Sequence, residues 1–141
     1  PNFESLIFMF QKELGEKIIG KYSTSDYSRL SIITNYRLDV IKKFNVSSNS
    51  FFPKPKITSM VIQFKPAKKK NFKIKKIESL EKVTNVLFSN KRKMINKNIT
   101  KILDKKTLAK IPYLNLGLRP AEIKPEIYYK ITELFEKNCQ N

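Results

Sequence analysis

The sequence predicts an α/β segment followed by a small all-helical domain, and two features of the chain indicate this. Over residues 1–66, short apolar runs alternate with stretches of helical spacing, the rhythm of strands and helices packed in layers. Over residues 77–141, every amphipathic stretch has helical spacing. Residues 67–76 lie between the two parts and are rich in lysine, so we expect them to form a solvated basic linker.

The first segment begins with a strand and a helix. Residues 6–10 (LIFMF) form a continuous apolar run, which is typical of a strand covered on both faces. Residues 11–21 then show helical spacing and end before a polar run at residues 23–26. The apolar side of this helix carries Leu14, Ile18 and Ile19.

A second helix and two strands complete this segment. Ser25 or Asp26 is expected to cap a helix over residues 27–36, because short polar side chains satisfy the free N–H groups of a first turn. Residues 38–44 and 57–64 are predicted to be strands. The residues of the helix that are expected to face inward are Leu30, Ile32 and Ile33.

Three apolar stripes predict the helices of the second part. The last helix begins near Pro125, since proline is favoured in a first turn. The stripes consist of Ile77, Leu80, Val83, Leu87 and Phe88; of Met94, Ile95, Ile99, Ile102 and Leu103; and of Ile127, Ile131, Leu134 and Phe135.

Composition narrows the classes of function. The net charge of +17 over 141 residues favours a polyanionic partner such as nucleic acid. Lysine, isoleucine and asparagine are all abundant, so A/T-rich codon usage is an alternative source of part of this charge. The absence of histidine excludes His-based catalysis and the commonest zinc sites, and no metal is expected. With one cysteine, no signal peptide and no membrane span, we expect a cytoplasmic chain without a membrane partner.

The charge is concentrated in one region. Residues 65–106 carry 15 basic and 3 acidic side chains. On a single helix, Lys93, Lys97, Lys101 and Lys105 would fall within a sector of roughly 120°, opposite the apolar stripe. Such a row can lie along a phosphate backbone, and a merely solvated face is the alternative. The candidate RNA-binding residues here are Lys91, Arg92, Lys93, Lys97 and Lys101, with Arg92 able to grip a phosphate bidentately.

A loop over residues 47–55 leads into the last strand of the first segment. It presents Phe51 and Phe52 before the run Pro-Lys-Pro-Lys, and each proline fixes φ near −65°. Lys54 and Lys56 are therefore held on a stiff cationic rim, where they can contact RNA. An aromatic side chain on such a rim can stack on a nucleobase, a contact worth roughly 1–3 kcal/mol. The alternative for Phe51 is a core anchor, and we expect Phe52 to be structural.

Five segments, in order along the chain, carry a resemblance to a known family. They are residues 8–13 (FMFQKE), 26–31 (DYSRLS), 51–59 (FFPKPKITS), 88–93 (FSNKRK) and 116–123 (LGLRPAEI). Together they resemble the rRNA adenine N6,N6-dimethyltransferase family of the bacterial KsgA type. The resemblance implies the C-terminal part of a Rossmann-like methyltransferase sheet followed by a helical RNA-binding domain. It also implies transfer of methyl groups from S-adenosylmethionine to N6 of two adjacent adenines of small-subunit rRNA, during ribosome biogenesis.

The family's upstream motifs, a Gly-rich loop and an Asn-Leu/Ile-Pro-Tyr motif, have no counterpart here, where the only glycines are Gly15, Gly20 and Gly117. The resemblance thus implies that the cofactor-binding residues lie outside this chain and that the chain alone is inactive. It assigns to Phe51 the stacking of the target adenine. The implied partner is small-subunit rRNA or the immature small ribosomal subunit, bound by a monomeric protein. A related large-subunit rRNA adenine methyltransferase and a non-catalytic nucleic-acid-binding relative are the alternatives.

Overall fold

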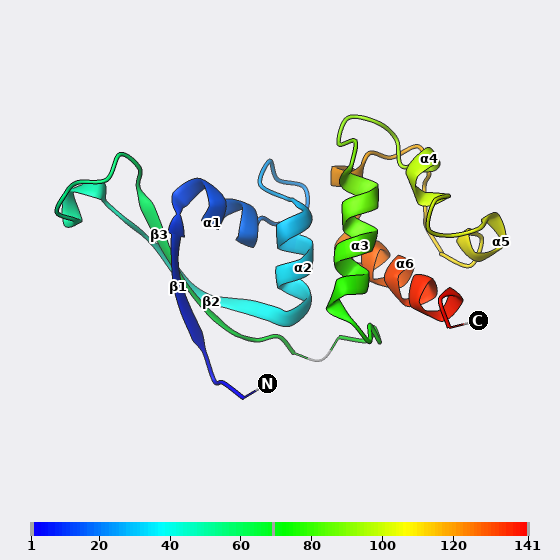
Figure 1. Ribbon diagram of the computed structural model, residues 1–141, viewed down its shortest axis with the longest axis horizontal. Helices are drawn as coiled ribbons and strands as arrows, with labels where there is room; N and C mark the ends of the chain where they lie inside the picture. The colour runs from blue at the N-terminus through cyan, green and yellow to red at the C-terminus, as the bar shows by residue number, and fades with distance from the viewer. Residues whose placement is uncertain (1, 69, 141) are drawn as a thin grey trace. The chain divides into compact units, whose positions relative to one another are not determined.

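The chain forms two compact units, which divide between Lys70 and Asn71 (Figure 1). The computed structural model describes residues 2–68 and 70–140. Lys69, which belongs to the predicted linker, lies outside the described residues. No helix in the described ranges is long and apolar enough to cross a bilayer.

Unit 1 consists of a three-stranded antiparallel sheet with two helices. The strand order is β1 (Leu6–Gln11), β3 (Ser59–Pro66), β2 (Leu38–Val46), so the last strand along the chain lies in the centre. Both neighbours pair with β3, which therefore depends on contacts that are distant in sequence. The elements are β1 (Leu6–Gln11), α1 (Lys12–Ile19), α2 (Arg29–Arg37), β2 (Leu38–Val46), a 3-10 turn (Ser48–Ser50) and β3 (Ser59–Pro66).

One face of the sheet holds the core of unit 1. Met60, Ile62 and Phe64 alternate along β3 and are buried, because successive side chains of a strand point to opposite faces. Ile18 and Ile19 of α1 pack against these three residues. Gly15 allows this close approach, since a Cβ there would lie 2.9 Å from the Met60 sulfur.

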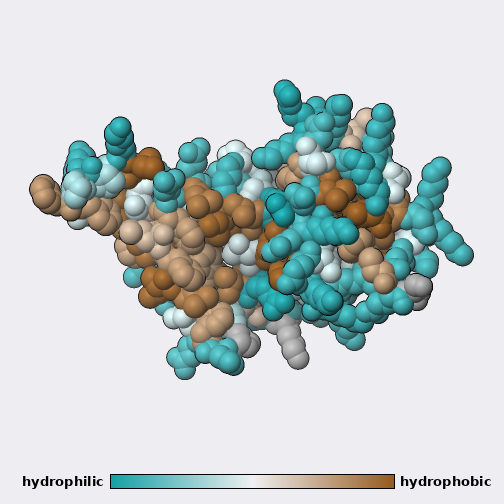
Figure 2. Space-filling model, in the orientation of Figure 1, coloured by the Kyte–Doolittle hydropathy of each residue, from teal (hydrophilic) through white to brown (hydrophobic). Residues whose placement is uncertain are grey.

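The opposite face of the sheet is exposed, and this corrects the expectation that residues 6–10 are covered on both sides. Ile7, Met9 and Phe44 are 64%, 56% and 52% exposed. Ile7 and Met9 pair with Gln63 and Val61 of β3, which places them on the face away from the core. Hydrophobic colouring spreads over much of the visible surface of unit 1 in Figure 2. The apolar run predicted the strand correctly, but even on its core-facing side only Leu6 and Phe10 are partly buried, and Phe8 is 48% exposed.

The helix predicted from residue 27 begins two residues later, and its cap is Ser28 instead of Ser25 or Asp26. The Ser28 hydroxyl accepts a hydrogen bond from the Ser31 N–H at 3.4 Å, and the Ser28 N–H donates to the Ser31 Oγ at 3.0 Å. The Ser28 hydroxyl also donates to the Lys17 carbonyl at 2.8 Å, which ties α2 to the end of α1. Asp26 instead forms an ion pair with Lys17 at 3.8 Å. Of the three residues expected to face inward, Ile32 is fully buried and Leu30 is exposed.

Unit 2 is helical, as its stripes predicted, and is built around two long helices that pack on each other. Phe88 of α3 (Ile77–Phe88) and Tyr128 of α6 (Pro125–Asn138) stack with ring centroids 5.7 Å apart. The Tyr128 hydroxyl donates to the Pro120 carbonyl at 2.7 Å, so this buried phenol is satisfied. The elements are α3 (Ile77–Phe88), α4 (Asn96–Ile99), α5 (Lys105–Leu108), a 3-10 turn (Pro120–Glu122) and α6 (Pro125–Asn138).

The second half of the predicted solvated linker is bound to α6. The backbone N–H groups of Lys75 and Lys76 donate to the two carboxylate oxygens of Glu136, at 2.8 and 2.9 Å. The Lys73 N–H donates to Glu133 at 2.5 Å. Hydrogen bonds from backbone N–H groups to Glu133 and Glu136 therefore hold this lysine-rich segment in place. Such donors do not depend on the identity of the side chain.

The helix predicted to carry the row of lysines is broken into two single turns, α4 and α5. The polar side chains of this region bond to the nearby backbone and compete with helix formation. The Asn96 side-chain oxygen Oδ1 accepts from the Lys97 N–H at 2.8 Å, and the Thr100 hydroxyl donates to the Lys97 backbone carbonyl at 2.9 Å. Asp104 then caps α5 through the Thr107 N–H at 2.6 Å. Lys105 therefore does not continue a helical face with the other three lysines.

Candidate nucleic-acid interface

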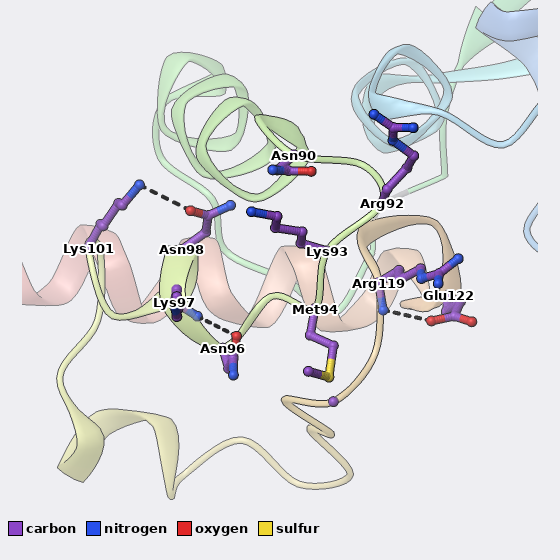
Figure 3. Close-up of a pocket in the computed structure, with 11 residues that line it drawn as sticks. Asn90, Arg92, Lys93, Met94, Asn96, Lys97, Asn98, Lys101, Arg119 and Glu122 are labelled. Carbon is purple, nitrogen blue, oxygen red and sulfur yellow. Dashed lines mark hydrogen bonds between the residues drawn. The ribbon is translucent and has the colours of Figure 1, made fainter.

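Unit 2 contains an open, cationic pocket of about 1050 Å³. It lies between the turn that follows α3, the short helix α4 and the loop before α6 (Figure 3). The residues that line it are Asn90, Arg92, Lys93, Met94, Asn96, Lys97, Asn98, Lys101, Gly117, Arg119 and Glu122.

A backbone contact joins the two halves of this pocket. The buried Ile95 N–H donates to the Leu118 carbonyl at 3.0 Å, which holds the turn after α3 against the loop at residues 115–119. Met94 points toward this loop, and its sulfur would lie 3.9 Å from a Cβ at Gly117. Two segments that are far apart in sequence, 88–93 and 116–123, thereby contribute to one site.

The electrostatic character of the pocket is strongly positive. Its lining includes five cationic side chains and one carboxylate, Glu122. A Glu122 carboxylate oxygen accepts a hydrogen bond from the Arg119 backbone N–H at 2.6 Å. This carboxylate therefore already has a hydrogen-bond donor within the loop. Lys101 donates to the Asn98 side-chain oxygen at 3.0 Å, and the Asn98 amide donates to Ser89 at 3.1 Å. A ligand with several negative charges fits such a lining.

Four of the five candidate residues of this region line the pocket: Arg92, Lys93, Lys97 and Lys101. Lys91 is exposed and is not part of the lining. The spacing of the charges did not predict Arg119 or the three asparagines of the lining, because they have no periodic relation to the lysines. Arg119 lies in the segment 116–123 that matched the family, and that match was the one signal that could have pointed to it.

The loop that contains Pro53 and Pro55, residues 47–58, belongs to unit 1, where it extends past the ends of β2 and β3 (Figure 1). Phe51 is half-buried with extended backbone, and Lys54 and Lys56 are exposed. Phe52 is 102% exposed, so the expectation that it is structural is wrong. The stacking role of Phe51 stays a prediction.

The described residues offer little to a metal ion. No group of three or more His, Cys, Asp or Glu side chains among them could hold one. Cys139 is exposed and carries a free thiol.

Comparison with known proteins places this chain in a family. The family model described as ribosomal RNA adenine dimethylase matches residues 1–137. The ribosomal RNA small subunit methyltransferase A of Pelagibacter ubique is 39% identical over 135 residues, which is 95% of this chain and 51% of that protein. The protein of the same name from Malacoplasma penetrans is 34% identical over 92% of this chain and 48% of its own length. The chain thus spans about half the length of these relatives.

Two solved structures share the fold. A dimethyladenosine transferase from Plasmodium falciparum superposes with a TM-score of 0.73 and 24% identity, over 99% of this chain and 59% of that one. The 23S rRNA methyltransferase ErmE superposes with a TM-score of 0.60 and 19% identity, over 96% of this chain and 56% of the other. The sheet with its two helices and the helical unit are therefore the architecture of such enzymes over the matched region. With a family model matching 137 consecutive residues, this chain belongs to the ribosomal RNA adenine dimethylase family.

Proposed function

We propose that this chain is the C-terminal part of an rRNA methyltransferase that transfers methyl groups from S-adenosylmethionine to N6 of two adjacent adenines of small-subunit rRNA. The family match over residues 1–137 carries this proposal. The relatives named as small-subunit methyltransferases support the choice of substrate over the large-subunit alternative. The protein is proposed to act as a monomer in the cytoplasm, on the immature small subunit.

The described residues do not fit S-adenosylmethionine. A methyltransferase of this kind binds its cofactor on a glycine-rich turn, and the three glycines of this chain serve other contacts. Gly15 lies against Met60, and a Cβ at Gly20 would collide with the Asp26 carbonyl. Gly117 lines the cationic pocket. We therefore assign the cofactor to sequence outside this chain, and we propose that the chain alone is inactive.

The contribution of this chain is to hold RNA and to form one wall of the adenine site. In this proposal the aromatic ring of Phe51 stacks on the target base after it leaves the RNA stack. Lys54 and Lys56 lie on the same loop and would contact phosphates beside that base. Arg92, Lys93, Lys97, Lys101 and Arg119 would bind the RNA backbone in the pocket of unit 2.

Methyl transfer to purified ribosomal subunits tests this function. The full-length protein that contains this chain is expected to transfer label from radioactive S-adenosylmethionine to small subunits that lack the two dimethyladenines. Large subunits should take up no label, and the 141-residue chain alone should transfer none. Label on large-subunit RNA would favour the large-subunit alternative. Binding of RNA without transfer to either subunit would favour the non-catalytic relative.

Removing three lysines of the pocket is expected to weaken RNA binding through its electrostatic part. With Lys93, Lys97 and Lys101 changed to Gln, the slope of log K against log salt should become shallower by about 2 to 3, since each phosphate contact contributes roughly 0.7–0.9. Affinity at moderate salt should fall about tenfold. A salt titration of the binding constant measures both quantities.

The matched control removes three lysines of the same unit that do not line the pocket. Lys106, Lys110 and Lys137 are exposed, and their joint change to Gln removes the same net charge. The control variant should lose much less of the slope than the pocket variant. Equal losses in the two variants would mean that the charge acts only as a general field and that the pocket is not an RNA site.

A further inference from the structure

Phe52 presents a complete aromatic ring to solvent beside the half-buried Phe51. Its side chain is 102% exposed, against 52% for Phe44, an exposed phenylalanine of the neighbouring strand β2. A ring exposed to this extent leaves its π-faces accessible to a flat ligand. The ring is therefore available to a binding partner.

The two rings differ in their exposure to solvent. Phe51 is half-buried and has extended backbone, with φ −120° and ψ 148°. Phe52 is fully exposed, so its ring is accessible to a group other than the one held by Phe51.

The loop that carries Phe52 is restrained and cationic. Pro53 and Pro55 fix their own φ angles and restrict the residues before them. The Phe51 N–H donates to the Ser48 carbonyl at 3.4 Å, and the Ser47 hydroxyl accepts from the Asn49 N–H at 3.2 Å. Residues 47–58 contain Lys54 and Lys56 and no acidic residue. A stiff loop loses little entropy on binding, and its charge favours an anionic partner over an apolar one.

We propose that Phe52 stacks on a second unpaired base of the bound RNA, next to the base held by Phe51. This inference rests on the proposed function, since it takes RNA as the substrate. An aromatic ring beside two lysines matches a nucleotide, which has a flat π-face and a phosphate. The two phenylalanines together hold two consecutive nucleotides of an unpaired strand, and Lys54 and Lys56 contact the phosphates that join them.

The test uses the full-length protein and an RNA hairpin whose loop contains two adjacent adenines. In separate hairpins, each adenine and each of their two neighbours is replaced by 2-aminopurine, whose fluorescence falls when it stacks. Phe52→Ala is expected to weaken hairpin binding about tenfold, within the range for loss of one base–aromatic stack, and to leave the probe bright in the complex. Phe52→Trp should bind within about twofold of the parent, because it keeps a stacking surface. A fully paired RNA duplex should bind all three proteins equally.

A control variant and two outcomes make the result decisive. Tyr113→Ala removes a ring of unit 2 that is 97% exposed and should leave hairpin binding and probe fluorescence unchanged. Unchanged affinity and quenching in Phe52→Ala would overturn the proposal. So would a lower unfolding temperature in Phe52→Ala with unchanged RNA binding, because the ring would then pack against protein. Loss of the stack in a protein that transfers no methyl group would reject the proposed enzymatic function and keep this inference.

Discussion

Replacing Phe51 with leucine in the full-length protein is expected to lower the rate of methyl transfer about ten- to hundredfold. Leucine keeps much of the apolar bulk of this half-buried side chain but removes the π-face. Loss of one base–aromatic stack costs roughly 1–3 kcal/mol. We expect most of this cost in the reacting complex, where the stack holds the adenine in position for methyl transfer. Single-turnover rates with small subunits, together with the RNA dissociation constant, measure the two effects separately.

The pattern of variants distinguishes stacking from packing at Phe51. Phe51→Tyr keeps the ring and should retain most of the rate, while the RNA affinity of Phe51→Leu should fall less than its rate. The unfolding temperature of Phe51→Leu should stay near that of the parent. If the rate is unchanged and the unfolding temperature drops, Phe51 is an anchor of the loop and the assignment by resemblance is wrong.

Replacing Glu136 with alanine is expected to destabilise the protein by about 3 kcal/mol. This carboxylate is buried and accepts hydrogen bonds from the backbone N–H groups of Lys75 and Lys76 at 2.8 and 2.9 Å. Its removal leaves two backbone donors without their acceptor, at roughly 1–3 kcal/mol for each unsatisfied group. Chemical unfolding measures the change in free energy. Glu126 is exposed in the first turn of the same helix, and Glu126→Ala should change stability by less than about 0.5 kcal/mol.

The same contacts predict an acid-dependent loss of stability. Burial raises the pKa of Glu136, but the N–H groups of Lys75 and Lys76 and the Ser79 side chain together outweigh this and hold its pKa below the ordinary 4.5. A carboxyl whose pKa is lower in the folded state stabilises the fold fully above pH 4.5, and this contribution is lost as the pH falls through the folded-state value. Glu136→Gln should remove this part of the acid dependence. An acid profile identical to that of the parent would contradict the role given to Glu136.

Long apolar stripes were the most reliable guide to the fold. The stripes predicted α3 and α6 because a 12- or 14-residue helix repeats its apolar spacing often enough to be recognised. The helix predicted from the row of lysines was wrong because local hydrogen bonds interrupt it. The spacing of the lysines fits a helix, but Asn96, Thr100 and Asp104 bond to nearby backbone and limit the region to single turns. Lys93, Lys97 and Lys101 nevertheless line one pocket. Turns that reverse the chain can bring side chains together, as the face of a helix does.

The sequence by itself determined the charge of this protein, its strands and long helices, and its family, because composition, periodicity and five short segments are local properties. Only the tertiary structure decided that Arg119 shares a pocket with Arg92, that Glu136 holds the linker, and that Phe52 is exposed. Arg92 and Arg119 are 27 residues apart in the sequence, and Lys76 and Glu136 are 60 apart, so no local pattern encodes these contacts. Such contacts form when the apolar faces of α3 and α6 pack together, and packing depends on the whole chain at once.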